Sequence, residues 1–375
     1  RFFSKKYSDS DSAYEAIRNM LSNLDDPYTR FLDPREFNQM RIDTAGELTG
    51  IGIQIVKDKE SDNLIIVSPI EGTPAYKAGI KARDKILSID NVSTKGMNIE
   101  DAVKLIRGER GTKVKLGILR NGNSFFKLIS RERIELKSVT SKINKTKEGF
   151  LVGYVRIKQF NANASKEMKE TVKDLEIKKV SGYILDLRSN PGGLLESSID
   201  ISRQFIDKGI IVSTLSKDGL RETKRGNGKA LTNKPLVVLV NEGSASASEI
   251  VSGAIRDNNR GKLVGKKTFG KGLVQSMRTL VDGSGLTVTV AKYLTPNGTD
   301  INKSGIIPDI EVRMNINPIL RREIGTRKDK QYRAGEKELV NIIKRNNQIS
   351  EFNPNTTNLH AFLKINKENK VFALN

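Results

Sequence analysis

A serine that could act as a nucleophile lies in a run of small residues in the second half of the chain. Leu236–Val240 is apolar throughout, and N-E-G-S-A-S-A-S-E follows it, ending at Glu249. The pattern predicts a buried strand, a tight turn and a helix from Ser246 to Arg256. Free N–H groups at a helix start favour negative charge, which suits the oxyanion formed in acyl transfer. Ser246 and Glu249 also have the spacing of a capping box, so a purely structural helix start is the alternative.

A lysine between two glycines could serve as the base for that serine. Lys271 lies in the segment G-K-K-T-F-G-K-G-L-V-Q, which runs from Gly265 to Gln275. An ordinary lysine, with a pKa of about 10.4, is charged at neutral pH, but burial lowers that value and yields an amine able to take a proton. Gln275 could orient this amine without adding charge. The alternative is a solvated loop lysine.

The same segment nearly matches a phosphate-binding loop of the Walker A type. That loop needs Ser or Thr after its lysine to bind magnesium, and Gly272 occupies the position. We therefore do not expect an ATPase, and the sequence indicates no cofactor and no metal.

A third segment could supply oxyanion donors. Leu185-Asp186-Leu187-Arg188-Ser189-Asn190-Pro191-Gly192-Gly193 reads as a strand that ends in a tight turn before a helix. The N–H groups of such a turn are exposed to a ligand. The alternative is an ordinary strand-to-helix turn in which glycine supplies a positive φ.

Composition excludes several classes of enzyme. The chain of 375 residues has no Cys and one His, His360, so cysteine proteases, disulfides and two-histidine zinc sites are ruled out. A Ser-His-Asp triad could use only His360, which lies in a polar tail. The net charge of +21 leaves open a peripheral association with an anionic membrane, but its even spread favours an ordinary basic surface, and we expect no nucleic-acid partner.

Hydrophobic periodicity divides the chain into four regions. Residues 1–46 read as short helices, 47–131 as a mostly β module, 132–315 as strands alternating with helices, and 316–375 as a basic, partly helical extension. Asn121-Gly122 predicts a tight hairpin within the β module. The expected fold class is α/β with a largely buried sheet.

Together the three chemical segments resemble the carboxyl-terminal processing proteases, also called tail-specific peptidases, of peptidase family S41. The family pattern is N-P-G-G, then S-A-S-A-S-E, then T-[FY]-G-K-G-x-x-Q. In this chain it occurs at Asn190–Gly193, Ser244–Glu249 and Thr268–Gln275, with the spacing that the family shows. The resemblance implies a crotonase-like ββα protease core with an inserted PDZ domain. It implies Ser246 as nucleophile, Lys271 as base and Gln275 as its orienting residue, with Gly192 and Ala247 as oxyanion donors and Glu249 and Asp257 as supporting residues.

The region 47–131 resembles a PDZ domain. Its carboxylate-binding loop would consist of Gly50, Ile51, Gly52 and Ile53. In this recognition mode, loop N–H groups bind a terminal carboxylate while the peptide adds a strand to the sheet edge. We therefore expect protein substrates with apolar C-terminal tails. The alternative is a PDZ fold that serves only for packing.

Residues Leu24–Phe37 (L-D-D-P-Y-T-R-F-L-D-P-R-E-F) are similar to the N-terminal segment of cyanobacterial and plastid members. That similarity implies an exported protein of the periplasm or thylakoid lumen, with the photosystem II D1 precursor as a candidate substrate. Two other functions stay open at this stage: a non-catalytic PDZ scaffold on a protease-like fold, and a crotonase-like enzyme acting on thioesters. The oligomeric state is not predicted.

Overall fold

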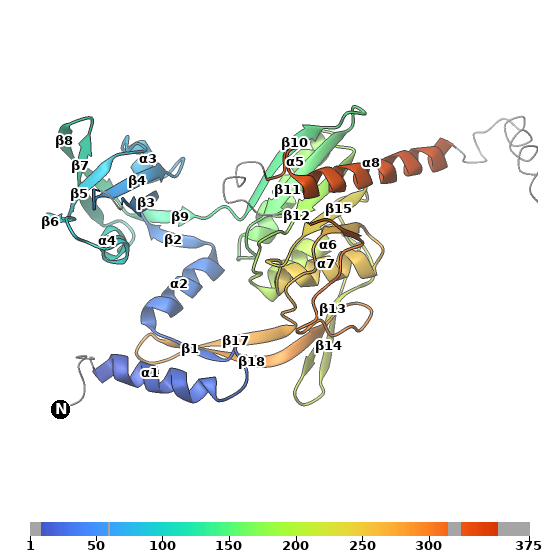
Figure 1. Ribbon diagram of the computed structural model, residues 1–375, viewed down its shortest axis with the longest axis horizontal. Coiled ribbons are helices and arrows are strands. Elements are labelled where there is room, and N and C mark those ends of the chain that lie inside the picture. Colours follow the sequence, from blue (N-terminus) through green and yellow to red (C-terminus); the bar gives the residue numbers. More distant parts are fainter. Residues whose placement is uncertain (1–8, 59–60, 314–323, 352–375) are drawn as a thin grey trace, which may run out of the picture. The chain divides into compact units, whose positions relative to one another are not determined.

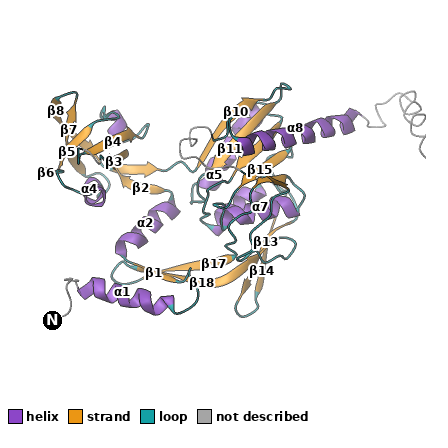
Figure 2. Cartoon of the chain, in the orientation of Figure 1, coloured by secondary structure: helices purple, strands orange, loops and turns teal. Residues whose placement is uncertain are grey.

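The computed structural model describes residues 9–58, 61–313 and 324–351 (Figure 1). The chain forms two compact units. One consists of residues 1–40 together with 137–375, and the other of residues 41–136. The smaller unit is thus inserted into the larger one, and Figure 2 shows that both mix helices and strands.

A six-stranded sheet forms the centre of the larger unit, in the order β10-β11-β12-β15-β16-β19. Only β10 and β11 pair antiparallel, and the other neighbours are parallel. Its strands are β10 Val139–Lys145, β11 Leu151–Ile157, β12 Gly182–Asp186, β15 Leu236–Val240, β16 Lys262–Gly265 and β19 Ile310–Glu311. Because the central strands β12 and β15 are buried along their whole length, both faces must be covered.

Helices cover the two faces of this sheet (Figure 1). On one face, α5 (Ala164–Ile177), α6 (Leu195–Arg203) and α7 (Ala247–Asp257) enclose a core that includes Leu185 and Val238. On the other, α8 (Lys330–Glu351) places Tyr332 and Leu339 against side chains such as Val237. The alternation of inward and outward side chains along each strand produces these two cores.

A second sheet of the larger unit is built around the long strand β18 (Gly285–Leu294). Its order is β1-β18-β13-β14, with β17 also paired to β18. The strands are β1 Arg30–Leu32, β13 Ile210–Ser216, β14 Arg221–Arg225 and β17 Leu273–Thr279. The N-terminal helices α1 (Asp9–Ser22) and α2 (Pro34–Ala45) flank β1 in the sequence. Strand β1 therefore ties the start of the chain to residues more than 250 positions away.

The smaller unit contains a six-stranded antiparallel sheet in the order β3-β4-β5-β7-β8, with β6 also paired to β5. The strands are β3 Ile53–Lys57, β4 Leu64–Pro69, β5 Lys85–Ile89, β6 Val92–Ser93, β7 Lys113–Arg120 and β8 Asn123–Ser130. Helices α3 (Pro74–Lys77) and α4 (Ile99–Ile106) and a separate pair, β2 (Glu47–Gly50) with β9 (Glu132–Glu135), complete it. Asn121 and Gly122 have φ values of 49° and 83°, so the predicted hairpin is confirmed.

The last region differs from its expected role as an extension. Helix α8 starts at Lys330 and packs on the central sheet, with Tyr332 and Leu339 fully buried. The polar composition of this helix hid its apolar stripe, which faces the sheet. Residues 316–375 are therefore not a separate extension throughout, because helix α8 shares a core with the central sheet of the larger unit.

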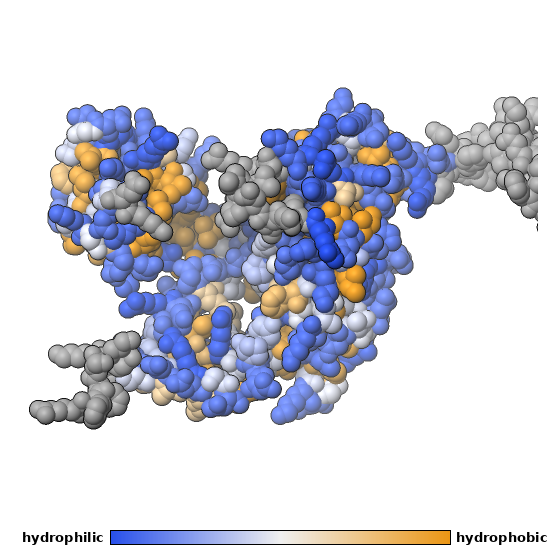
Figure 3. All heavy atoms as spheres, viewed as in Figure 1, coloured by the Kyte–Doolittle hydropathy of each residue, from blue (hydrophilic) through white to orange (hydrophobic). Residues whose placement is uncertain are grey.

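The visible surface of the chain is mostly hydrophilic, with groups of apolar side chains on both units (Figure 3). Exposed apolar residues of the smaller unit include Val56, Val67, Phe126 and Leu128. Within the described ranges, no helix is both long and apolar enough to cross a bilayer.

Candidate active site

Ser246 lies at the junction of β15 and α7, as the sequence predicts. Its φ of 53° is in the left-handed region, which is uncommon for a residue with a side chain. A backbone held in such a conformation costs about 1–3 kcal/mol and persists only where the surroundings fix it. Here the residues on both sides of Ser246 are held by Asn190. Ala245 N–H donates to the backbone oxygen of Asn190 at 3.0 Å, and Ser248 Oγ donates to the same oxygen at 2.9 Å.

The carboxylate of Glu249 joins the serine turn to the lysine loop. Its Oε2 accepts hydrogen bonds from the backbone N–H groups of Ser246 and Lys271, each at 2.9 Å. Its Oε1 accepts from Thr268 Oγ1 at 2.6 Å and from Gly270 N–H at 2.7 Å. Glu249 is fully buried. Since both nitrogens lie 2.9 Å from one oxygen, Ser246 N and Lys271 N are no more than about 5.8 Å apart.

Tyr293 of β18 makes a second link between the same two residues. Its hydroxyl lies 3.1 Å from the carbonyl oxygen of Ser246 and 2.5 Å from that of Lys271. Burial raises the pKa of Tyr293 well above its usual value, and the charge of Glu249 raises it further, so the hydroxyl keeps its proton. The main chains of Ser246 and Lys271 are thus fixed side by side at both their N–H and C=O groups.

The Lys271 side chain is half-buried, and this environment disfavours the charged form of its amine. Burial lowers the pKa of Lys271, the charge of Arg30 lowers it further, and the carboxylate of Asp26 raises it. The Nζ atom sits 4.6 Å from the centroid of the Tyr28 ring. In the part of the chain that the structure describes, no ion pair involves Lys271, and no hydrogen bond joins its Nζ to Ser246 Oγ.

The expected oxyanion donors lie against the serine. A β-carbon added to Gly192, whose φ is +104°, would fall 2.8 Å from Ser246 Cβ and 3.0 Å from Ala247 N. This position therefore requires glycine. The Gly192 N–H itself donates to Asn190 Oδ1 at 2.9 Å, so it is already occupied within its own turn. Ala247 is the first residue of α7, where N–H groups have no partner within the helix.

The two remaining candidates are placed differently. Gln275 lies on β17, half-buried, and its Nε2 is 3.5 Å from Thr289 Oγ1. Asp257 is at the far end of α7, about 15 Å of helix away from Ser246. Its buried carboxylate binds Arg256 and the backbone N–H of Asn297. Asp257 therefore anchors the end of the helix and does not support the serine site.

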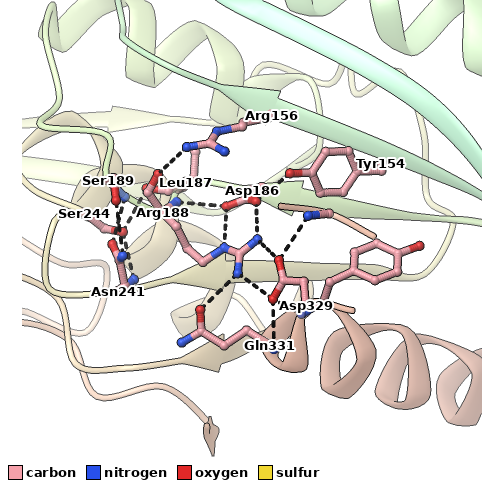
Figure 4. Close-up of polar contacts among 12 residues, drawn as sticks. Tyr154, Arg156, Asp186, Leu187, Arg188, Ser189, Asn241, Ser244, Asp329 and Gln331 are labelled. Carbon is pink, nitrogen blue, oxygen red and sulfur yellow. Dashed lines mark hydrogen bonds and ion pairs between the residues drawn. The ribbon is translucent and has the colours of Figure 1, made fainter. Parts of the chain in front are cut away.

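A buried ion-pair network is centred on Arg188 (Figure 4), which precedes the turn with Gly192 in the sequence. The Arg188 guanidinium binds Asp186 with two nitrogens at 2.9 and 2.6 Å and Asp329, at the start of α8, at 3.0 and 2.7 Å. Tyr154 donates to Asp186 at 2.6 Å. The pKa of Asp329 is lowered: burial alone would raise it, but the hydrogen bonds and charge of Arg188 outweigh burial. The residues at the start of α8 thus fix the strand end that leads into the turn with Gly192.

The loop between β2 and β3 contains the expected peptide-binding residues of the smaller unit. Gly50 ends β2 and Ile53 starts β3, which is an edge strand of its sheet with α4 packed against it. The Ile51 side chain is only 1% exposed and belongs to the apolar core, so any role in binding falls to its backbone. Ile70 N–H and Thr73 Oγ1 hold the carbonyl of Gly52 at 2.9 and 3.2 Å, which orients the loop.

No cluster of three or more His, Cys, Asp or Glu side chains in the described ranges could hold a metal ion. His360 lies outside those ranges.

Comparison with known proteins identifies the family. Residues 151–312 match the sequence pattern of Peptidase family S41, and residues 65–120 match that of a PDZ domain. The chain is 44% identical to the carboxyl-terminal-processing protease of Synechocystis sp. over 336 residues, or 89% of this chain and 78% of that protein. The chain therefore belongs to peptidase family S41. It is a serine-type carboxyl-terminal-processing peptidase, and the predicted family and fold class are confirmed.

Other members give the same result. The carboxy-terminal processing protease CtpA of Bacillus subtilis is 40% identical over 312 residues, which is 83% of this S41 peptidase and 66% of that protein. Among solved structures, the photosystem II D1 C-terminal processing protease is 37% identical with a TM-score of 0.50, and the match covers 82% of this chain and 84% of that chain.

Sequence reasoning missed the contacts that three residues make around Ser246 and Lys271 in this S41 peptidase. Tyr293 and the backbone carbonyl of Asn190 form hydrogen bonds with residues that are distant in the sequence, and neither has a local signal for that contact. Tyr28 lies in the N-terminal segment that the sequence singled out only as a mark of relatedness. Its proximity to Lys271 depends on the pairing of β1 with β18, and no sequence motif predicts that pairing.

Proposed function

We propose that this peptidase cleaves proteins near their C-termini by a Ser246–Lys271 dyad, with the smaller unit binding the substrate tail. The observation that carries the proposal is the shared carboxylate of Glu249, which binds the backbone N–H of both residues. Two residues 25 positions apart, one hydroxyl and one partly desolvated amine, are thereby held on adjacent stretches of main chain.

In the first step, the neutral amine of Lys271 takes the proton of Ser246 Oγ while the oxygen attacks the scissile carbonyl carbon. The negative charge that develops on the carbonyl oxygen is met by the N–H of Ala247 at the helix start. Gly192 N–H becomes the second donor to this oxygen once its hydrogen bond to Asn190 Oδ1 breaks. The Lys271 ammonium then gives its proton to the leaving amine as the C–N bond breaks, and water hydrolyses the acyl-serine with Lys271 again as base.

The amine must turn from Tyr28 toward Ser246 for the first step. A lysine side chain has four rotatable carbon–carbon bonds, and the two backbones are already adjacent, so rotation of the side chain alone covers the distance. Gln275 supports the rotated position: its Nε2 is occupied by Thr289, which leaves Oε1 to accept a hydrogen bond from the amine.

Substrate choice is assigned to the loop Gly50–Ile53 and strand β3. Loop N–H groups bind the terminal carboxylate, and the tail pairs with the edge of β3 beside α4. This mode selects tails with apolar ends. The D1 precursor is a candidate substrate, because the chain is similar to the photosystem II D1 C-terminal processing protease. The chloroplastic and cyanobacterial relatives support an exported protein of the lumen or periplasm.

The test is incubation with a protein that ends in an apolar tail, followed by mass spectrometry of the products. Wild type should release a C-terminal fragment, whereas Ser246→Ala and Lys271→Ala should fold and release none. Tail binding without turnover in wild type would instead identify a scaffold, and full cleavage by either variant would refute the dyad.

A further inference from the structure

Tyr28 is a residue for which the proposed mechanism has so far no role, although it touches the base directly. Its ring centroid is 4.6 Å from Lys271 Nζ. A cation within about 6 Å of an aromatic face is stabilised by the negative charge density of that face. Burial acts in the opposite direction, because it disfavours the ammonium form of Lys271.

The backbone of Tyr28 is held at both ends. Its N–H donates to Asp26 Oδ1 at 3.0 Å, and its carbonyl accepts from Thr287 Oγ1 at 2.8 Å. Thr287 lies on β18, the same strand whose Tyr293 grips the Lys271 carbonyl. Strand β18 thus holds the backbone of both Tyr28 and Lys271, so the ring has a fixed position beside the amine.

Other charged and titratable groups around the amine come from three elements. Asp26 and Arg30 flank Tyr28 in the N-terminal segment and act on the Lys271 charge with opposite signs. Glu249 of α7 binds the Lys271 N–H, and Tyr293 of β18 binds its carbonyl. None of these groups forms an ion pair with the amine in the described part of the chain, whereas the Tyr28 ring lies within cation–π distance of it.

We infer that Tyr28 is a positioning residue that seats the Lys271 ammonium on its ring in the free enzyme and thereby keeps the base able to hold a proton. This inference rests on the proposed dyad. The base must accept a proton from Ser246 and later return it to the leaving amine, so a pKa driven too low by burial would leave Lys271 too weak a base for the first task. The ring offsets part of the burial effect without supplying a carboxylate, which would trap the proton.

The test is the pH dependence of kcat/KM on a tail peptide, because its acidic limb reports the free enzyme. In Tyr28→Leu the ammonium loses the ring, so the limb should move to lower pH by about 0.5–1.5 units. In Tyr28→Phe, the matched control, the ring is kept and the limb should superimpose on that of wild type. An unmoved limb or one at higher pH in Tyr28→Leu would overturn the inference, as would an equal shift in Tyr28→Phe.

A second series guards against misfolding of Tyr28→Leu. Phenylalanines with one, two and three ring fluorines, incorporated at position 28, keep the shape of the ring while removing charge density from its face. The limb should move stepwise to lower pH along the series, and a flat series refutes the inference. Activity in Lys271→Ala would show instead that the dyad itself is wrong, so the two failures are separable.

Discussion

The Glu249 carboxylate is the most sensitive point of the site, and Glu249→Gln tests it with a change of one atom. The carboxamide keeps one oxygen, but its NH₂ replaces the other and faces two N–H or O–H donors. Two of the four hydrogen bonds are therefore lost. Each hydrogen bond to a charged group contributes about 1.5–3 kcal/mol, so unfolding should become easier by about 3–6 kcal/mol.

The same change should reduce catalysis beyond its effect on stability. A displacement of about 1 Å between reacting groups lowers the rate by about 100-fold. We expect kcat on a tail peptide to fall at least that far at a temperature where the variant is folded, with little change in KM, since the loop proposed to bind the peptide, Gly50–Ile53, belongs to the smaller unit. Thermal unfolding followed by circular dichroism gives the stability, and steady-state kinetics give the rate.

Glu242→Gln is the matched control. Glu242 lies in the same turn, but its carboxylate is 56% exposed and binds the exposed amine of Lys266. Such pairs contribute at most about 1 kcal/mol, so this variant should resemble wild type. If Glu249→Gln retained wild-type kcat and melting temperature, Glu249 would not join the two segments and the account of the site would be wrong.

Three further predictions concern separate parts of the site. Gly192→Ala should abolish cleavage and lower the free energy of unfolding, because its β-carbon would fall 2.8 Å from Ser246 Cβ at a φ of +104°; wild-type activity would contradict this. Asp329→Asn should destabilise the protein by about 3–5 kcal/mol in chemical denaturation, because it weakens the partner of a buried guanidinium, whereas Asp300→Asn, in an exposed pair, should cost below about 1 kcal/mol. Lys271→Met should be inactive yet more stable, by about 1 kcal/mol, at neutral pH. The pKa of Lys271 is lower in the folded than in the unfolded chain, so folding releases a proton, wild-type stability rises with pH between the two values, and the gain in melting temperature should shrink above that window.

Local patterns predicted the elements that carry the chemistry. Apolar Leu236–Val240 is a buried strand, and the small residues after it lead into α7 as expected. Asn121-Gly122 forms the predicted hairpin because both positions need a positive φ. These features depend on neighbours in the sequence, which a single chain displays.

Features that depend on distant contacts were not predictable. Strand β1 has three residues and exists only because β18 pairs with it. The apolar stripe of α8 is surrounded by lysines and arginines, so its packing on the sheet is invisible in the composition. Asp257 follows a family pattern in the sequence, yet eleven residues of helix carry it away from Ser246.

The central claim is that Ser246 forms a covalent intermediate with the help of a neutral Lys271. The most direct measurement is acid quenching during turnover of an activated tail-peptide ester, followed by mass spectrometry of the tryptic fragments. We predict an acyl group on the fragment that contains Ser246, with a yield that rises with pH through the lowered pKa of Lys271. An acyl group on another residue, or its persistence at full yield in Lys271→Ala, would contradict the claim.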